Sequence, residues 1–276
     1  MRCAAMDAVT HRYNEVRMIS SLSTHLPYLW LVAASFIGGA MNAMAGGGSF
    51  ISFPAMLAIG VPPIQANATN TVALWPGQLT SVWALRMDLR RDLIGVVASA
   101  SVLGGVGGAL VLLHTGQVTF MHLVPWLLLV ASLLFWISGP AGRWLHERAE
   151  DPGVPRQPAL LPLFLVLFPV CFYIGYFGAG AGFLIMSALA LFGVEEMNAL
   201  NSLKVTAACL SNLSAVVTFI AGGAIVWHYC VVSMVFAAIG GYAGAQYARR
   251  MNADVLRTVV VVIGCAMAAY FFWRQA

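Results

Sequence analysis

The chain has 276 residues, of which 61% are hydrophobic and only 9% are charged. Soluble domains carry charge on about a quarter of their residues, so this composition excludes an ordinary soluble protein and predicts a chain that crosses a membrane several times. The formal net charge of +4 comes mainly from arginines in the polar stretches between apolar segments, where it indicates membrane topology and not a nucleic-acid surface.

The five cysteines show no paired spacing, and four of them fall within apolar segments. This distribution is typical of small core residues and argues against a disulfide framework or a zinc site. We therefore expect no metal ion and no cofactor. Basic residues up to Arg17 precede an apolar run that ends near Ala45, as in a secretory signal. Since an internal repeat begins before that point, we expect no cleavage there.

In chain order, a polar N-terminal segment, residues 1–25, precedes five apolar segments in each half of the chain. They lie at about 26–45, 48–60, 67–86, 92–114 and 118–138, and at 159–177, 180–193, 198–220, 226–247 and 253–273. Most are long enough to span a bilayer, which takes about 20 helical residues. The polar stretch 139–158, rich in proline and charge, is predicted to be a cytoplasmic linker.

The two halves of the chain resemble each other. A shift of 133 residues aligns identical residues: Gly47 with Gly180, Phe50 with Phe183, Gly60 with Gly193, and Ser81 with Ser214. The predicted fold class is therefore an all-α polytopic membrane protein with two homologous repeats, residues 26–138 and 159–276.

Loop charges indicate that the repeats are inverted. The loop after the third segment carries three arginines within residues 86–91 in the first half and no Lys or Arg in the second. The pattern reverses after the fourth segment, where Arg249 and Arg250 make the second half basic. If basic loops stay cytoplasmic, equivalent loops lie on opposite sides of the membrane. This arrangement would put both chain termini outside the cell, and the arginines of the N-terminal segment contradict that. Parallel repeats with an internal N-terminus therefore remain open.

A glycine cluster separates the short second segment of each half from the segment before it. The clusters are Gly46-Gly47-Gly48, followed by Ser49, and Gly178-Ala179-Gly180-Ala181-Gly182. Short, glycine-interrupted segments at matching positions are the best sequence indication of a transporter binding site. We therefore expect glycine-broken helices at the centre of the fold, with the substrate near mid-membrane between the two breaks. The first turn after each break leaves backbone N–H groups and the positive end of the helix dipole free to hold an anion. Close helix packing through small residues is the alternative.

Two other glycine sets occur within the longer apolar segments. They are Gly104, Gly105 and Gly108 in the first half, and Gly240, Gly241 and Gly244 in the second. Small residues let membrane helices approach closely, so we expect these glycines to pack helices and not to bind a ligand.

The single lysine, Lys204, lies inside an apolar segment. A cationic side chain at the centre of a membrane helix costs about 2.5 to 3.5 kcal/mol on insertion scales, so it needs a partner or a task, and an anionic substrate is one such task. Helical spacing puts Lys204, Ser211 and Asn212 on one face. The alternatives are a lysine that snorkels to the nearby membrane surface and an asparagine that only joins helices.

The corresponding stretch of the first half carries neutral polar side chains. Asn67, Thr71 and Gln78 share one helical face, and Asn70 is adjacent. Amide and hydroxyl donors of this kind can hold oxyanion oxygens without a second positive charge. For Gln78, a hydrogen bond between helices is again the alternative.

The acidic residues are as informative as the lysine. All ten fall in loops, tails or at segment ends, so no carboxylate is available in the membrane to bind a cation or relay protons. A cation transporter is therefore disfavoured. No cluster of His, Cys and acidic residues has metal-site spacing, and we expect neither a catalytic residue nor an enzyme.

The ordered set of motifs resembles the TauE/SafE family of sulfite exporters and sulfonate permeases. The residues that carry the resemblance are Gly46 to Phe50, Pro54, Gly60 and Ala66 to Asn70 in the first half, and Gly178 to Gly182, Gly193, Lys204 and Asn212 in the second. It covers nearly the whole chain from about residue 26. The resemblance implies a bacterial inner-membrane protein that moves sulfite, sulfonates or sulfoacetate, without fixing the substrate or direction.

These observations predict a secondary transporter of a small sulfur-containing oxyanion, with the bilayer as its surroundings, no nucleic-acid partner, and homo-oligomerisation left open. The candidate substrate-binding residues are Gly46, Gly47, Gly48, Ser49, Asn67, Asn70, Thr71, Gln78, Gly178, Gly180, Gly182, Lys204 and Asn212. A passive anion channel and a membrane scaffold subunit without transport are the alternatives.

Overall fold

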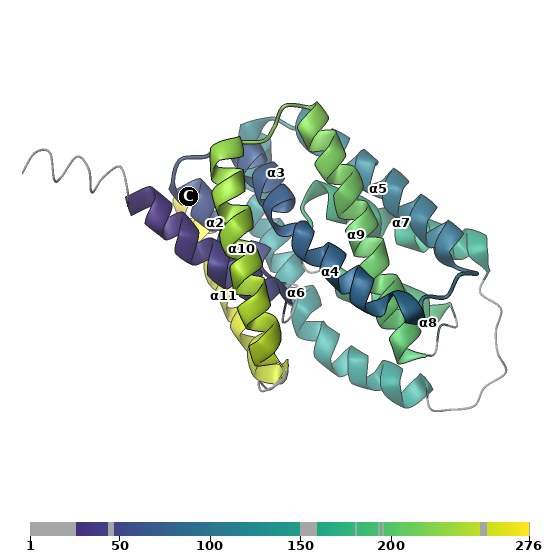
Figure 1. The fold of residues 1–276 in the computed structure, drawn as a ribbon. Coiled ribbons are helices and arrows are strands. Elements are labelled where there is room, and N and C mark those ends of the chain that lie inside the picture. The colour runs from purple at the N-terminus through teal and green to yellow at the C-terminus, as the bar shows by residue number, and fades with distance from the viewer. Residues whose placement is uncertain are drawn as a thin grey trace, which may run out of the picture.

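The computed structural model describes residues 26–43, 47–149, 159–179, 181–192, 194, 196–248 and 253–275. Every regular element in these residues is helical (Figure 1). Five stretches are long and apolar enough to cross a membrane: Leu26–Ala43, Ile94–His114, Gln117–Leu134, Met197–Ala221 and Thr258–Gln275. The chain is therefore an all-helical, multi-pass membrane protein, as its composition predicts.

The helices follow the predicted segments closely. They are a first helix Leu26–Ala43, α2 Ser49–Ala58, α3 Pro63–Leu74, α4 Pro76–Leu85, the 3₁₀ turn η1 Arg86–Asp88, α5 Ile94–His114, α6 Gln117–Ala149, α7 Leu160–Tyr176, α8 Gly182–Leu191, α9 Met197–Ala221, α10 Trp227–Ala248 and α11 Ala253–Gln275. Helix α6 continues past residue 138, into the stretch that the sequence assigns to the linker.

The third predicted segment, residues 67–86, is two helices and not one. Helix α3 ends at Leu74 and α4 begins at Pro76. Proline has no backbone N–H, so Pro76 cannot continue the helical hydrogen-bond pattern, and the helix is interrupted at Trp75. In the second half the corresponding helix, α9, is continuous from Met197 to Ala221. The two halves therefore differ at this position.

The glycine faces of α5 and α10 pack against the backbones of neighbouring helices. A Cβ atom on Gly108 would lie 2.0 Å from the carbonyl oxygen of Phe172 in α7. A Cβ atom on Gly240 would lie 1.9 Å from the carbonyl oxygen of Phe36 in the first helix. No side chain fits such gaps, so the packing role predicted for these glycines is confirmed. Gly241 is looser, with its nearest such neighbour at 3.6 Å.

Contacts along each helix pair give the helix directions. Two helices are parallel when the residue numbers at their contacts rise together along both. This holds for three pairs: Gly104 with Phe168 and Gly108 with Phe172 (α5 and α7), Phe36 with Gly240 and Ala40 with Gly244 (first helix and α10), and Gly105 with Ser211 and Leu113 with Gly222 (α5 and α9). Two helices are antiparallel when the residue numbers rise along one and fall along the other. This holds for two pairs: Gln78 with Asn212 and Leu85 with Ser202 (α4 and α9), and Met121 with Gln275 and Ser132 with Gly264 (α6 and α11).

Helices α6 and α10 both begin beside the first half of α3. The Ile64 N–H donates to Gln117 at the start of α6, and the Val226 N–H, just before α10, donates to Thr69. The first helix, α3, α4, α6 and α10 therefore run one way, and α5, α7, α9 and α11 run the other. Figure 1 shows α3 and α4 crossing between the group of α5, α7 and α9 and the group of the first helix and α10.

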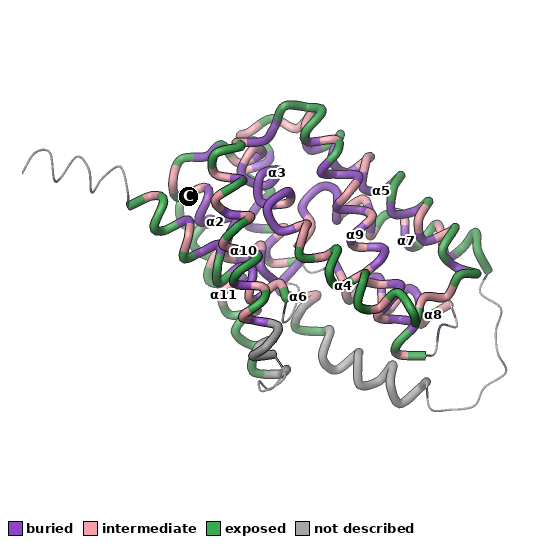
Figure 2. The backbone as a smooth tube through the Cα atoms, in the orientation of Figure 1, coloured by how far each residue is buried: buried purple, intermediate pink, exposed green. Residues whose placement is uncertain are grey.

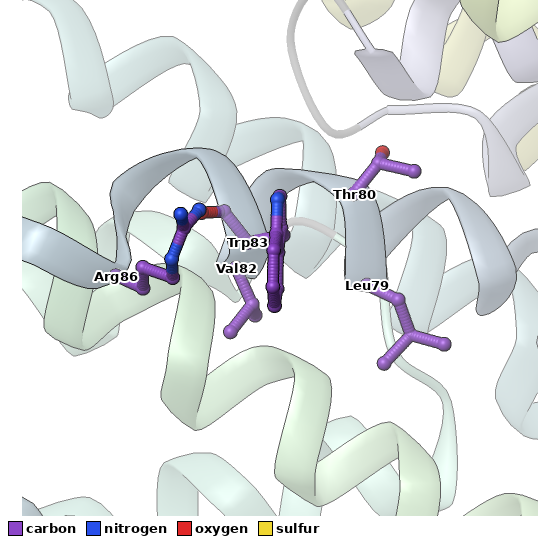
Figure 3. A pocket seen from close by; sticks show the side chains of 5 residues that line it. All are labelled: Leu79, Thr80, Val82, Trp83 and Arg86. Atoms are coloured by element: carbon purple, nitrogen blue, oxygen red, sulfur yellow. The ribbon is translucent and has the colours of Figure 1, made fainter.

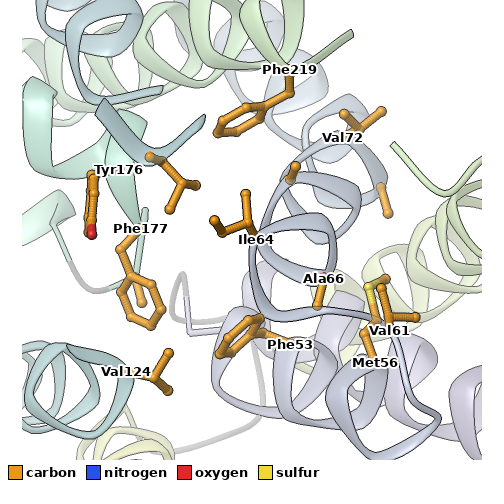
Figure 4. Close-up of a cluster of buried hydrophobic side chains, with 14 of the residues drawn as sticks. Phe53, Met56, Val61, Ile64, Ala66, Val72, Val124, Tyr176, Phe177 and Phe219 are labelled. Atoms are coloured by element: carbon orange, nitrogen blue, oxygen red, sulfur yellow. The ribbon is translucent and has the colours of Figure 1, made fainter. Parts of the chain in front are cut away.

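Aromatic rings fill the core around the end of α7. The Phe53 ring of α2 meets Phe177 edge-on, with ring centroids 5.8 Å apart, and Phe120 of α6 meets Tyr176 at 5.8 Å (Figure 4). Edge-to-face pairs of this kind add stability beyond the buried area. Figure 2 shows buried stretches along α3 and α9, whereas α4 buries none of its residues. The ring cluster thus packs around the end of α7, next to the second glycine cluster.

The glycine contacts predict a sharp stability difference within α5. We expect Gly108→Ala to lower the free energy of unfolding by about 1–3 kcal/mol or more, because its Cβ would overlap the α7 backbone. Gly95→Ala, in the same helix, meets nothing within 4 Å and should be neutral or slightly stabilising. Thermal unfolding of both variants in detergent measures this difference, and equal midpoints would contradict the close α5–α7 contact.

Candidate functional site

Asn67 joins α3 to the end of α7. Its side chain is 2% exposed, and its Nδ2 donates to the carbonyl oxygen of Tyr176 at 3.1 Å. The last carbonyls of a helix lack partners within the helix, so the amide satisfies one of them. Thr71, one turn further along α3, donates to the Asn67 carbonyl of its own helix at 2.9 Å. Asn67 therefore stabilises the backbone near the second glycine cluster, whereas Thr71 bonds within α3.

Three polar side chains meet at the start of α2, and we call Ser49, Ser52 and Asn70 the α2 cluster. Asn70 is 1% exposed, and its Nδ2 donates to the Ser49 hydroxyl at 3.1 Å. The Ser52 hydroxyl lies within hydrogen-bond distance of the Asn70 Oδ1 and of the Gly48 carbonyl. Each polar group of this cluster thus has a partner, and the cluster carries no charge.

The glycines before α2 are tightly packed. A Cβ atom on Gly48 would lie 2.2 Å from the carbonyl oxygen of Gly38 in the first helix, and one on Gly47 would lie 2.8 Å from Val260 in α11. Gly46 lies outside the described residues. Glycine is required at Gly48 because a neighbouring backbone occupies the space of any side chain. In this conformation, close packing accounts for the first glycine cluster.

The second glycine cluster leads into a more open and cationic site. We call Gly182, Asn201 and Lys204 the α8 cluster. The nearest atoms to a Cβ on Gly182 would be Cδ and Cγ of Lys204, at 3.7 and 4.0 Å, which is ordinary contact. The Lys204 Nζ donates to Asn201 Oδ1 at 3.0 Å. Gly180 lies outside the described residues.

The Lys204 ammonium has no carboxylate partner in the described part of the chain. The ion pair found there joins Arg90 to Asp92, in the loop before α5. The same residues contain no group of three His, Cys, Asp or Glu side chains that could hold a metal ion. A positive charge in apolar surroundings without a paired anion is costly, so this position favours an anionic ligand.

A pair of amides, Gln78 and Asn212, joins the first turn of α4 to the central part of α9, and we call it the central pair. The Asn212 Nδ2 donates to Gln78 Oε1 at 3.1 Å and to the Ala208 carbonyl at 3.0 Å. A Cβ atom on Gly178 would lie 3.8 Å from Asn212 Oδ1. Gly178 has φ +82°, a backbone conformation that glycine adopts without strain. The central pair therefore lies beside the turn between α7 and α8.

Trp75 closes the break between α3 and α4 against α9. Its indole Nε1–H donates to the Cys209 carbonyl at 3.2 Å. On α9, Cys209 is one turn before Asn212 on the way to the end of the helix, so the indole lies near the central pair. The Trp75 side chain is therefore in contact with the α9 backbone.

Helical rise gives the depths of the two clusters. Asn70 lies seven residues after the start of α3, and Lys204 lies seven residues after the start of α9, so each is about 10 Å along its helix. Because α3 and α9 run in opposite directions, the two clusters lie toward opposite ends of the bundle. The central pair lies between them along the helix axes, since Gln78 of α4 contacts Asn212 of α9.

Two polar residues of these clusters, Ser52 and Asn201, are absent from the predicted set. Ser52 follows Ser49 by three residues, and Asn201 precedes Lys204 by three, so each shares a helical face with a predicted residue. That spacing is the signal that could have found them. The clusters otherwise bring the predicted residues together in small groups and not in one continuous pocket.

Comparison with known proteins gives the family of the chain. The sequence profile described as Sulfite exporter TauE/SafE matches residues 31–271. The chain belongs to the TauE/SafE family. Among similar proteins are a Sinorhizobium probable membrane transporter protein, ORF9, and a probable membrane transporter protein of Haemophilus influenzae. They are 30% and 29% identical, over 91% and 89% of this chain and 94% of their own length.

A third relative is YfcA of Escherichia coli, also described as a probable membrane transporter protein, which is 27% identical over 93% of this chain and 92% of its own length. No solved structure matches the chain significantly. The family and the relatives make this chain a membrane transporter. Their names do not state what this chain carries.

The central pair predicts an energetic coupling between α4 and α9. We expect Gln78→Ala and Asn212→Ala to interact by about 0.6 kcal/mol in a double-mutant cycle, the average for membrane hydrogen bonds between helices. Combining Gln78→Ala with Ser202→Ala, on the same two helices, should be additive, because Ser202 bonds to the Leu85 carbonyl instead. Unfolding free energies in mixed micelles measure both cycles, and additivity in the first would refute the bond.

Proposed function

We propose that this TauE/SafE protein is a secondary transporter that carries a small sulfur-containing oxyanion across the bacterial inner membrane. The observation that carries the proposal is the Lys204 ammonium, which lies within α9, touches the start of α8 and has no carboxylate partner among the described residues. An anionic substrate would supply the missing partner. The family description, Sulfite exporter TauE/SafE, supports sulfur oxyanions as the substrate class.

The helix directions support two inverted repeats, residues 26–138 and 159–276. In the sequence alignment of the halves, the first helix corresponds to α7, α3 with α4 to α9, α5 to α10, and α6 to α11. In each of these pairs the two members run in opposite directions through the bundle. The contacts between the two halves are also equivalent: α5 of the first half packs on α7 of the second, and α10 of the second half packs on the first helix. Inverted repeats with a site at their interface are typical of secondary transporters.

The three polar groups suggest a path through the protein. An oxyanion at the α8 cluster would accept hydrogen bonds from the Lys204 ammonium and from the first N–H groups of α8. The amides of the central pair could donate to the same anion as it moves toward the α2 cluster, where Ser49, Ser52 and Asn70 offer neutral groups. Gly182 supports this path, because a Cβ atom there would be in ordinary contact with the Lys204 stem and would not overlap a neighbouring backbone.

The charge of Lys204 predicts how variants transport. Lys204→Met should lower anion uptake at least about tenfold, the equivalent of about 1.4 kcal/mol of lost binding, while folding is kept or improved. Lys204→Arg should restore uptake only partly, because a planar guanidinium does not reproduce a compact ammonium. Arg91→Gln removes the same charge from an exposed loop and should leave uptake unchanged.

Uptake by proteoliposomes with equal amounts of each variant measures these effects. A lysine that only snorkels to the surface predicts that Lys204→Met is nearly silent and that arginine replaces lysine fully. Full uptake by the methionine variant would therefore remove Lys204 from the mechanism. Saturable uptake with counter-flow distinguishes a transporter from a channel, and absence of any anion flux would favour a scaffold.

Ligand stabilisation tests the substrate class. We expect sulfite, thiosulfate, a sulfonate or sulfoacetate to raise the unfolding temperature of the purified protein, since a ligand at about 100 times its Kd stabilises by about 2.7 kcal/mol. Choline and sodium salts of each anion separate the effect from that of the cation. The Lys204→Met variant should lose the shift. Stabilisation of both proteins to the same degree would place anion binding elsewhere.

A further inference from the structure

The outward side of α4 carries large apolar side chains that no part of the described chain covers. Leu79 is 44% exposed and Trp83 is 69% exposed. They are four residues apart, so they share one face of the helix. Together with Thr80, Val82 and Arg86 they line a hollow of about 480 Å³ (Figure 3). We call this hollow the α4 groove.

Arg86 is held at one end of the α4 groove by Trp83. Its guanidinium carbon lies 3.9 Å from the centre of the indole ring, and its Nη1 donates to the Trp83 carbonyl at 2.6 Å. Figure 3 shows the two side chains next to each other. Stacking fixes the plane of the guanidinium, and its other N–H groups have no acceptor among the described residues. They are therefore available to an anionic group from outside the protein.

The groove runs from the surface of the membrane toward its interior. The Leu85 carbonyl accepts a hydrogen bond from Ser202, which is only five residues after the start of α9, so Arg86 lies near the face at which α9 begins. Leu79 is seven residues before Arg86 and therefore about 10 Å deeper. A charged end at the surface and an apolar channel below it match the shape of a phospholipid, with phosphate above and acyl chain below.

The loop after Arg86 adds no net charge at this face, because Asp88 and Asp92 offset its two arginines. It contains Arg90 and Arg91. The Arg90 guanidinium hydrogen-bonds to Asp92 and lowers the pKa of that carboxyl, so these two charges are paired. Arg86 and Arg91 remain unpaired among the described residues. Basic loops of membrane proteins lie on the cytoplasmic side, where anionic phospholipids are concentrated.

We propose that the α4 groove binds one anionic phospholipid, with its phosphate on Arg86 and an acyl chain along Trp83 and Leu79. This site is separate from the anion path, because none of its lining residues belongs to the α2 cluster, the central pair or the α8 cluster. Binding here contacts α4, the helix that follows the break at Trp75. The lipid would therefore stabilise the position of α4 against α9.

Native mass spectrometry tests this proposal without reference to transport. The protein is released from micelles that contain equal amounts of phosphatidylglycerol and phosphatidylcholine with identical acyl chains. We expect the wild type to retain phosphatidylglycerol preferentially. Arg86→Gln should reduce that preference about fivefold, the factor for one arginine at a membrane surface, and Trp83→Leu should reduce it less because the apolar wall remains.

Arg91→Gln is the matched control, since it removes one charge from the same loop outside the groove and should leave the preference unchanged. An equal loss in Arg91→Gln and Arg86→Gln would overturn the proposal in favour of a diffuse surface charge. Equal retention of both lipids by the wild type would also overturn it. Soluble glycerol phosphate should not displace the lipid, and displacement would mean that the groove recognises free phosphate and not phospholipid.

Discussion

A membrane-spanning chain must satisfy its backbone polar groups from within the protein, because the bilayer core offers no hydrogen-bond partners. Two interruptions in the described part of the chain illustrate this constraint. Helix α7 ends at Tyr176, and Asn67 of α3 covers its carbonyl. Trp75 interrupts the helix before α4, and its own indole reaches the Cys209 carbonyl of α9. Asn67 is thus first of all a partner for the end of α7, and Trp75 links the interruption of α3 and α4 to α9.

The same residues are the ones that could hold an anion, and the two uses are connected. A helix break costs several hydrogen bonds, so it persists in a membrane only where side chains from neighbouring helices replace them. Those side chains are amides and hydroxyls, which also bind oxyanions. Asn70 and Asn212 hydrogen-bond to other side chains next to the starts of α2 and α4, and the proposed substrate could exchange with these bonds.

The two halves solve the problem of their breaks differently. At the start of α2, Gly48 is pressed against the first helix, and the α2 cluster is neutral with its groups paired. At the start of α8, Gly182 touches only the stem of Lys204, which brings a positive charge. A fully symmetric pair of cationic sites would repel each other through low-dielectric protein. One charged and one neutral cluster avoid that repulsion.

Much of this arrangement could be predicted from the sequence, because hydropathy and glycine are strong local signals. The all-helical fold, the membrane segments and the position of Lys204 within a helix follow from composition and spacing. The break at Trp75 was not predicted, although Pro76 is visible, because membrane helices often tolerate proline when neighbours satisfy the freed groups. Whether neighbouring helices allow such an interruption depends here on α9. Its Cys209 carbonyl, which accepts the Trp75 hydrogen bond, lies 134 positions after Trp75 in the chain.

The glycine clusters show most clearly where local sequence stops being sufficient. A run of glycines permits both close packing and close approach of a ligand, since each needs only the absence of a side chain. Which of them occurs depends on residues distant in sequence. Gly47 faces Val260 and Gly48 faces Gly38, whereas Gly182 faces the lysine. The same motif therefore has different surroundings in the two halves. Only the tertiary structure distinguishes glycines packed against a neighbouring helix from a glycine beside a lysine.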